Sequence, residues 1–102
     1  MTHPALQLKD VVHQRVRLGI LAVLEEVKRA DFSAVRDALE LSDGNLSRHV
    51  QVLEEAGLVK VEKGFEGRRP RTWITATRAG RKALAHELAA LRELISRVDG
   101  TD

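Results

Sequence analysis

Hydrogen-bonding side chains gather in the first half of one predicted helix, which starts after Ser42 and stops at Gly57. Leu46, Val50 and Leu53 recur at helical spacing, so they define its buried face. The opposite face and its flank carry small and hydrogen-bonding residues, namely Gly44, Asn45, Ser47, Arg48 and Gln51. Such side chains near a helix N-terminus suit insertion into the major groove of DNA, where base edges present donors and acceptors.

The individual side chains point to different contacts. The guanidinium of Arg48 has the geometry to read guanine through O6 and N7, and a phosphate contact or no contact is the alternative. Asn45 is suited either to reading adenine or to supporting the first helical turn. Ser47 is expected to bind phosphate. His49 is expected to lie on the flank of the helix or to contact phosphate.

A second group of candidate residues is basic. Residues 60–82 hold eight lysines and arginines against two glutamates, whereas the net charge of the whole chain is only +2. A basic block beside such a helix is typical of a nucleic-acid binder, and a solvated charged surface is the alternative. Within this block, Arg68, Arg69 and Arg71 surround a loop rich in glycine and proline. Guanidinium groups there suit either a narrow minor groove or simple attraction to phosphates.

The helices that must position these residues are also predicted by the sequence. Apolar residues at a 3.6-residue period predict a helix over residues 10–27. Ser33 is the predicted cap of a short helix over residues 34–39. A tight turn then leads into the helix described first, so residues 33–56 form a helix-turn-helix.

A β-hairpin is predicted directly after the helix-turn-helix. Alternating apolar and charged residues, a glycine- and proline-marked loop and a β-branched run predict strand, loop and strand over residues 58–63, 64–70 and 71–77. A hairpin in this position, over residues 58–77, is a wing. Phe65 and Trp73 are expected to pack in the core or at the base of the wing, because single-stranded binders need several exposed aromatic side chains.

The last predicted helix, over residues 78–98, is capped by Thr77 and is about 30 Å long. Its apolar residues follow heptad spacing, namely Leu84, Leu88, Leu91, Ile95 and Val98. A helix of this length cannot bury its whole seam against so small a domain, so the same helix of a second subunit is the simplest partner. We therefore predict a homodimer through these five residues, with residues 5–9 as a short helix or arm beside the helix.

Other classes of function find little support in the residues. The chain has no cysteine, which excludes disulfides and thiolate metal sites and fits a cytoplasmic protein. It has no apolar run of about 18 residues and no N-terminal signal pattern, so no membrane location is expected. His86 and Glu87 are neighbours and do not share a helix face, which argues against a metal site. No nucleophile–base pairing or phosphate-binding glycine loop indicates catalysis, so we expect no enzyme and no cofactor.

In this order, the segments resemble the winged helix-turn-helix transcriptional regulators. The similarity is to the arsenic-repressor and multiple-antibiotic-resistance-repressor groups, and most of all to a small stand-alone winged-helix DNA-binding family. It covers about residues 10–90 and rests on six segments: Arg17–Leu24, Phe32–Ser33, Leu39–His49, Leu53–Val59, Gly67–Trp73 and Thr77–Arg81. Each segment alone is weak evidence for the family, whereas the order and spacing of all six together are specific to it.

The resemblance implies a fold that is mainly α with a small β-hairpin, as one domain over residues 1–102 with a long C-terminal dimerisation helix. It also implies a homodimer that binds double-stranded DNA in a sequence-specific manner, usually as a repressor. Its recognition and wing positions fall on Asp43, Gly44, Asn45, Ser47, Arg48, Arg68, Arg69 and Arg71. Ser42, His49 and Gln51 complete our candidate DNA-binding set.

Two departures and two alternatives accompany the resemblance. Glu40 stands where relatives often have glycine, which predicts a slightly strained turn, and Arg78 stands where many have proline, which changes little. One alternative function is a winged-helix module that binds protein, for which an exposed apolar patch on the reading face would be the sign. The other is a repressor that senses a small-molecule effector or metal. Since 102 residues leave no room for a separate effector domain, that ligand would bind between the subunits' helices.

Overall fold

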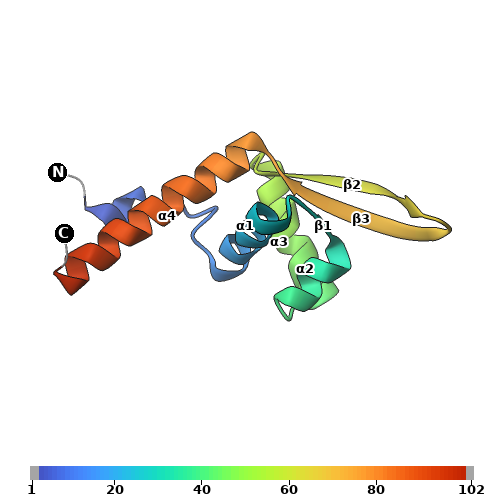
Figure 1. Ribbon diagram of the computed structural model, residues 1–102, viewed down its shortest axis with the longest axis horizontal. Coiled ribbons are helices and arrows are strands. Elements are labelled where there is room, and N and C mark those ends of the chain that lie inside the picture. The colour runs from blue at the N-terminus through green and yellow to red at the C-terminus, as the bar shows by residue number, and fades with distance from the viewer. Residues whose placement is uncertain (1–2, 101–102) are drawn as a thin grey trace.

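The computed structural model describes residues 3–100, which form an elongated molecule of 55 × 24 × 21 Å. In chain order the elements are η1 (Pro4–Gln7), α1 (Arg15–Val27), β1 (Arg29–Asp31), α2 (Phe32–Ala38), α3 (Asp43–Glu55), β2 (Val59–Glu66), β3 (Arg69–Ala76) and α4 (Arg78–Asp99). The three strands form an antiparallel sheet in the order β1-β3-β2. The β2–β3 hairpin and α4 leave the central helices in opposite directions (Figure 1). This is the predicted winged-helix architecture, mainly helical with a wing.

The hydrophobic core lies where the central helices meet the inner face of the sheet. Every large element contributes to it, with Ile20 and Leu24 from α1, Val35 from α2, Leu46, Val50 and Leu53 from α3, Ile74 from β3 and Leu84 from α4. The apolar stripe predicted for α3 is therefore confirmed, and it fixes which face of that helix points away from the protein.

The wing and α4 start from one tightly packed junction. Thr77 caps α4, because its Oγ1 accepts a 3.0 Å hydrogen bond from the Gly80 N–H. The same hydroxyl donates to the Gly57 carbonyl at 2.7 Å, and the Thr77 N–H donates to the Leu58 carbonyl at 3.0 Å. A Cβ on Gly80 would lie only 2.0 Å from the Leu58 carbonyl oxygen, so this close approach of α4 requires glycine.

Two predicted helix starts are wrong. The first helix begins at Arg15 rather than at residue 10, because the Gln14 side chain accepts a hydrogen bond from the Arg17 N–H and caps it there. The second begins at Phe32 rather than at residue 34, because Asp31 and not Ser33 is the cap. The positive φ of 54° at Glu40 confirms the strained turn between α2 and α3.

The wing has longer strands than predicted. Strands β2 and β3 pair without interruption out to Glu66 and Arg69, so the predicted loop over residues 64–70 shrinks to the two-residue turn at Gly67 and Arg68. Gly67 supplies the positive φ, 64°, that this turn requires. The very short strand β1 adds a third strand at the base of the wing by pairing with residues 73–75 of β3.

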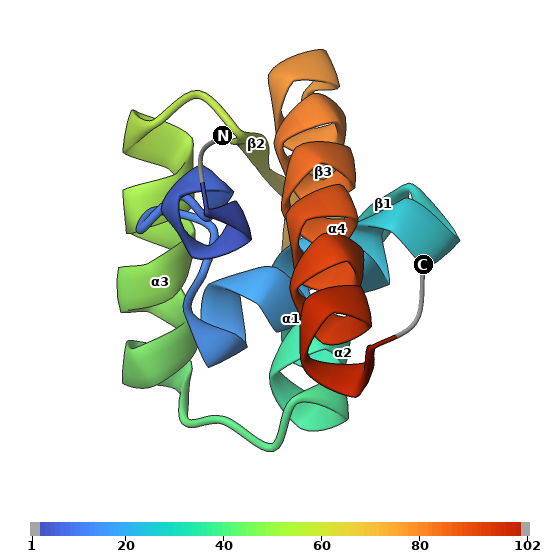
Figure 2. The same ribbon diagram turned by 90° about the vertical axis from the view of Figure 1, so that its left-hand side faces the viewer.

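The N-terminal segment lies beside α4, where the end-on view shows it in front of the helical body (Figure 2). One nitrogen of His86 is 3.0 Å from the Gln7 carbonyl. Glu87 is fully buried, where one carboxylate oxygen accepts from the Lys9 N–H at 3.1 Å and the other lies 2.8 Å from Nδ1 of His13. Of the two forms predicted for residues 5–9, a short helix or an arm, the structure shows a short helix over Pro4–Gln7, and its predicted place beside the last helix is confirmed.

The apolar seam predicted for the last helix is buried at its start and exposed toward its end. Leu84 is only 4% exposed and belongs to the core of its own subunit, so its predicted place in a dimer interface is wrong. Leu91 is partly buried. Leu88, Ile95 and Val98 are exposed, and Val98 reaches 79%. The large exposed apolar side chains of α4 are therefore found from Leu88 to the end of the helix.

Candidate nucleic-acid interface

The polar side chains at the start of α3 mainly stabilise the helix itself. The Ser42 hydroxyl caps the helix by accepting from the Asn45 N–H at 3.1 Å. Asp43 accepts a 2.8 Å hydrogen bond from Arg36 of α2, and this carboxylate together with Asp37 raises the pKa of Arg36. The ion pair joins the two helices of the helix-turn-helix, so Ser42 and Asp43 hold α3 in place.

Four exposed residues form what we term the α3 outer face: Gly44, Ser47, Arg48 and Gln51. The Arg48 guanidinium donates a 3.1 Å hydrogen bond to the Asn45 side-chain oxygen, so these two predicted base readers are brought together. Gln51 donates to Glu55 one turn later at 3.3 Å. Sequence spacing identified this exposed face correctly, and Asn45, which was also predicted to lie on it, is partly buried.

His49 lies on the flank of α3, as predicted, and turns toward α1. Its Nδ1 is 3.2 Å from Nη1 of Arg17, whose Nε also donates to the Val11 carbonyl at 2.7 Å. Burial, followed by the positive charges of Arg17 and Arg48, lowers the pKa of His49. A neutral imidazole can accept from Arg17, so His49 joins α3 to α1, and Arg17 in turn is bonded to the segment before α1.

A groove of about 430 Å³ separates α3 from the wing. Ser47 and Gln51 line its helical side, and Val61, Lys63 and Thr72 line its wing side. The groove thus brings two predicted phosphate- or base-contacting residues of α3 beside a lysine of β2. Phe32, Val50 and Glu54 complete the lining, so the groove combines apolar side chains with hydroxyl, amide, ammonium and carboxylate groups.

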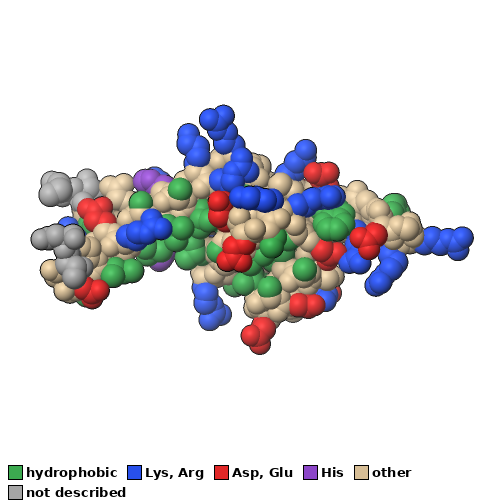
Figure 3. Space-filling model, in the orientation of Figure 1, with side chains coloured by type: hydrophobic (Ala, Val, Ile, Leu, Met, Phe, Trp, Pro, Cys, Tyr) green, Lys and Arg blue, Asp and Glu red, His purple; other side chains and the backbone are tan. Residues whose placement is uncertain are grey.

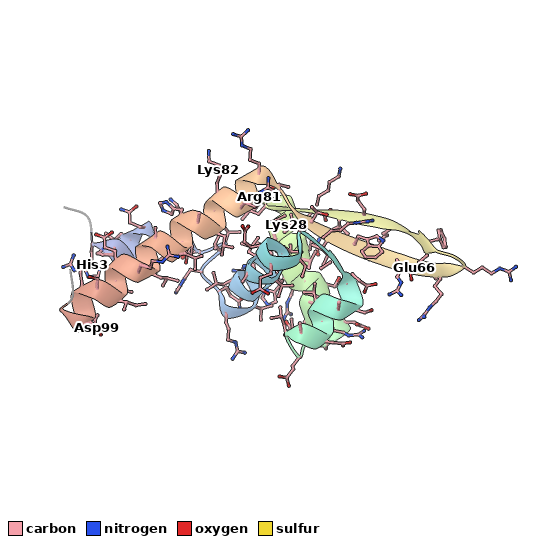
Figure 4. All side chains as sticks on the ribbon, in the orientation of Figure 1. His3, Lys28, Glu66, Arg81, Lys82 and Asp99 are labelled. Carbon is pink, nitrogen blue, oxygen red and sulfur yellow. The ribbon has the colours of Figure 1, made fainter. Side chains whose placement is uncertain are left out.

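The outer end of the wing is basic. Arg68 and Arg69 are exposed at the turn, and Lys and Arg side chains extend from this end of the molecule in the space-filling view (Figure 3). The side-chain view shows Glu66 on the same outer part of the hairpin (Figure 4). Arg68 and Arg69 are therefore placed as expected of residues that reach a nucleic acid.

Arg71 differs from these two arginines because it is bound within the protein. Its Nη1 donates to Oδ2 of Asp31, and its Nη2 lies 3.3 Å from Oε1 of Glu66. These contacts, led by the hydrogen bond to Asp31, raise the pKa of Arg71. Burial raises the pKa of Asp31, but hydrogen bonds from Ser33 and Arg71 outweigh it and lower that pKa overall. Arg71 thus joins the wing to the cap of α2.

The two aromatic residues of the wing have different surroundings. Trp73 is partly buried at the wing base, where the Arg29 guanidinium lies 4.2 Å from the ring centroid. Packing at the wing base was the prediction for this residue. Phe65 is 74% exposed near the wing tip, so its predicted packing role is wrong. The reason is that β2 continues past Gly64 and carries Phe65 beyond the helical body.

Residues 3–100 offer neither a metal site nor a membrane span. This part of the chain has no group of three or more His, Cys, Asp or Glu side chains that could hold a metal ion. Its helices are too short or too polar to cross a lipid bilayer.

Comparison with known proteins identifies the family. A family model described as a winged helix DNA-binding domain matches residues 16–95. The chain belongs to this family. The family and the fold are those of transcriptional regulators rather than of enzymes, and the resemblance found in the sequence is confirmed.

Three known proteins match most of the length of this winged-helix chain. A transcriptional regulator homologue from Pyrococcus horikoshii OT3 has 35% sequence identity and a TM-score of 0.89, and the match covers 97% of this chain and 99% of that one. The uncharacterized protein MJ0432 of Methanocaldococcus jannaschii is 33% identical, over 82% of this chain and 91% of its own length. The Mycobacterium tuberculosis regulator MosR, solved in complex with DNA, shares the fold with a TM-score of 0.73 at 22% identity, over 97% of this chain and 71% of that one.

Proposed function

We propose that this winged-helix chain is a sequence-specific, double-stranded DNA-binding transcriptional regulator that acts as a homodimer, most simply as a repressor. The observation that carries this proposal is the placement of the α3 outer face and the basic wing on either side of one groove. A helix and a hairpin so placed suit a major groove and the neighbouring minor groove, with one phosphate strand between them. AbfR and MosR, which share the fold, have both been solved bound to DNA, and this supports DNA as the partner.

Within this proposal the α3 outer face chooses the sequence. Arg48 stands one turn from the helix start, and Asn45 holds its guanidinium. If Arg48 makes a bidentate contact with guanine, its loss would cost about 1–3 kcal/mol of binding free energy. The loss would also relax the choice of base at one position. Arg68 and Arg69 supply affinity through phosphates or the electronegative minor groove. Arg71 has a positioning role, since its guanidinium is already bound by Asp31 and Glu66.

Dimerisation through α4 is the second part of the proposal. Leu88, Ile95 and Val98 are exposed along one helix that extends from the helical body, and such a surface needs a cover. The same helix of a second subunit offers a matching apolar surface with closed two-fold symmetry. A symmetric dimer of reading helices then binds two half-sites, and a repressor needs no more than this to obstruct transcription.

The test begins with selection of bound sequences from a random duplex pool. Recovery of an inverted repeat would support both DNA recognition and the dimer, and recovery of no enriched sequence would contradict sequence-specific binding. Arg48→Ala and Arg69→Ala are then compared on the selected duplex and on a scrambled one across a salt series. Arg48→Ala should shrink the difference between the duplexes. Arg69→Ala should weaken both equally and lower the slope of log affinity against log salt by about one phosphate contact. If Arg48→Ala weakened both duplexes equally and Arg69→Ala removed the sequence preference, Arg69 would choose the sequence and Arg48 would supply affinity.

A further inference from the structure

Phe65 leaves a large apolar side chain uncovered on the wing. It is 74% exposed, and its cross-strand partner Pro70 is exposed as well. The exposed apolar residues Ile95 and Val98 lie toward the far end of α4, which extends in the opposite direction from the wing (Figure 1). The proposed dimer interface therefore cannot account for the exposure of Phe65.

The strand register shows which way Phe65 faces. Successive residues of a strand alternate between its two faces, so Val61, Lys63 and Phe65 share one face of β2. Their cross-strand partners on that face are Ile74, Thr72 and Pro70. Because Val61, Lys63 and Thr72 line the groove beside α3, the Phe65–Pro70 pair continues the groove-facing side of the wing outward to its tip.

The charges around this pair indicate a polyanion rather than an apolar protein surface. Arg68 and Arg69 come three and four residues after Phe65, around the turn, and are exposed, and Lys63 precedes it on the same face. The nearest acid along the strand, Glu66, is 3.3 Å from Arg71, so its charge is partly compensated. A phosphate-lined groove thus satisfies both the basic and the apolar parts of the tip, since the walls of a minor groove are made of deoxyribose.

We propose that Phe65, backed by Pro70, contacts the deoxyribose wall of the minor groove into which Arg68 and Arg69 bring the wing tip. This inference rests on the proposed function and adds to the DNA affinity a contribution that does not depend on salt. Apolar side chains inserted into minor grooves act through burial of surface. Burial of the ring releases no condensed counterions, whereas a guanidinium that neutralises a phosphate does.

The test measures binding of Phe65→Ala to the selected duplex across a salt series. We expect binding to weaken about tenfold at every salt concentration, because partial burial of an aromatic ring is worth about one factor of ten in a binding constant. The slope of log affinity against log salt should stay that of the unaltered protein, and Phe65→Leu should retain most of the affinity. Val27→Ala, which shortens an exposed side chain outside α3 and the wing, is the matched control and should bind normally.

Several results would overturn the inference. Unchanged affinity of Phe65→Ala would show that the ring touches no DNA, and a changed salt slope would show that it acts only by arranging the arginines. Altered sedimentation of Phe65→Ala without DNA, at unchanged DNA affinity, would assign the tip to a second protein chain. Failure of the unaltered protein to bind any duplex would instead contradict the proposed function itself. Since Phe65 is exposed, Phe65→Ala should unfold at the temperature of the unaltered protein.

Discussion

Gly80→Ala and Gly44→Ala make the same chemical change in two helices and should alter stability in opposite directions. In a helix, alanine replaces glycine with a gain of up to about 1 kcal/mol, because glycine loses more backbone entropy on folding. The structure separates the two sites. A Cβ at residue 44 meets no atom within 4 Å, whereas one at residue 80 would stand 2.0 Å from the Leu58 carbonyl oxygen and 2.9 Å from its carbon.

The size of the Gly80→Ala effect follows from this distance. Non-bonded carbon atoms settle at about 3.5–4.0 Å, so α4 must move by more than an ångström relative to the start of β2. The neighbour is backbone, so no side-chain rotation relieves the overlap. Overpacking of this kind costs about 1–3 kcal/mol or more, which exceeds the gain in helix propensity. The displacement also strains the hydrogen bonds of Thr77 with Gly57 and Leu58.

Urea and thermal unfolding of both variants provide the assay. For a chain of this size, each kcal/mol lost lowers the melting temperature by about 4–8 °C. Gly80→Ala should therefore melt about 5–15 °C below the unaltered protein, and Gly44→Ala at or slightly above it. Equal or higher stability of Gly80→Ala would refute the argument that α4 requires a glycine at this contact. Gly44→Ala should still weaken DNA binding, since its added methyl group lies on the α3 outer face.

Three further predictions concern the wing, the dimer and the sensor question. Asp31→Asn should keep the α2 cap and lose the charge that holds Arg71. Because the pKa of Asp31 is lowered, that contribution is present above about pH 4 and lost as the pH falls through the lowered pKa, so the unfolding curves of mutant and unaltered protein should converge in acid. Leu88→Asp with Ile95→Asp should give monomers in sedimentation at tens of micromolar, because unpaired charges would be buried in the seam; a dimer in that experiment would move the interface elsewhere. DNA affinity should not respond to zinc, chelator or peroxide in a mobility-shift assay, since the chain has no cysteine, and a many-fold change would mean that a sensor site was missed.

Helical periodicity predicted burial better than it predicted backbone conformation. Leu46, Val50 and Leu53 are buried as their spacing required. Val12 is buried too, although it precedes the first helix, because the turn around it folds back onto the core. The sequence pattern could not distinguish these cases. The start of α1 depends on which group accepts a hydrogen bond from the backbone of the first turn. Here the Gln14 side chain accepts from the Arg17 N–H, and the helix begins after it.

The wing was predicted too short because Gly64 and Pro70 are typical of loops. Pro70 is tolerated in β3 because it lies beyond residues 73–75, the part of that strand that pairs with β1. Whether a strand edge is paired depends on the arrangement of the whole sheet, so the local sequence cannot predict it. Continuing the two-residue alternation past Gly64 would have placed Phe65 on the groove-facing side of the wing.

The residue types of the candidate site could be predicted, but their internal partners could not. The α3 outer face follows from helical geometry alone. The ion pair of Asp31 with Arg71 joins residues 40 positions apart, and the contact of Arg17 with His49 joins residues 32 apart. These contacts exist only once the sheet and helices have packed. They decide which basic residues are already bonded within the protein, as Arg71 is to Asp31 and Glu66.

The junction at Thr77 bears on how a dimer would choose half-site spacing. The end of α3, the start of β2, the end of β3 and the start of α4 meet there through Gly57, Leu58, Thr77 and Gly80. Close backbone contact leaves little room for bending, so a rotation of α4 must carry the wing and α3 with it. In the proposed dimer, the packing of two α4 helices therefore sets the distance between the two reading helices. Any ligand that altered that packing would change operator affinity without touching a DNA-contacting residue.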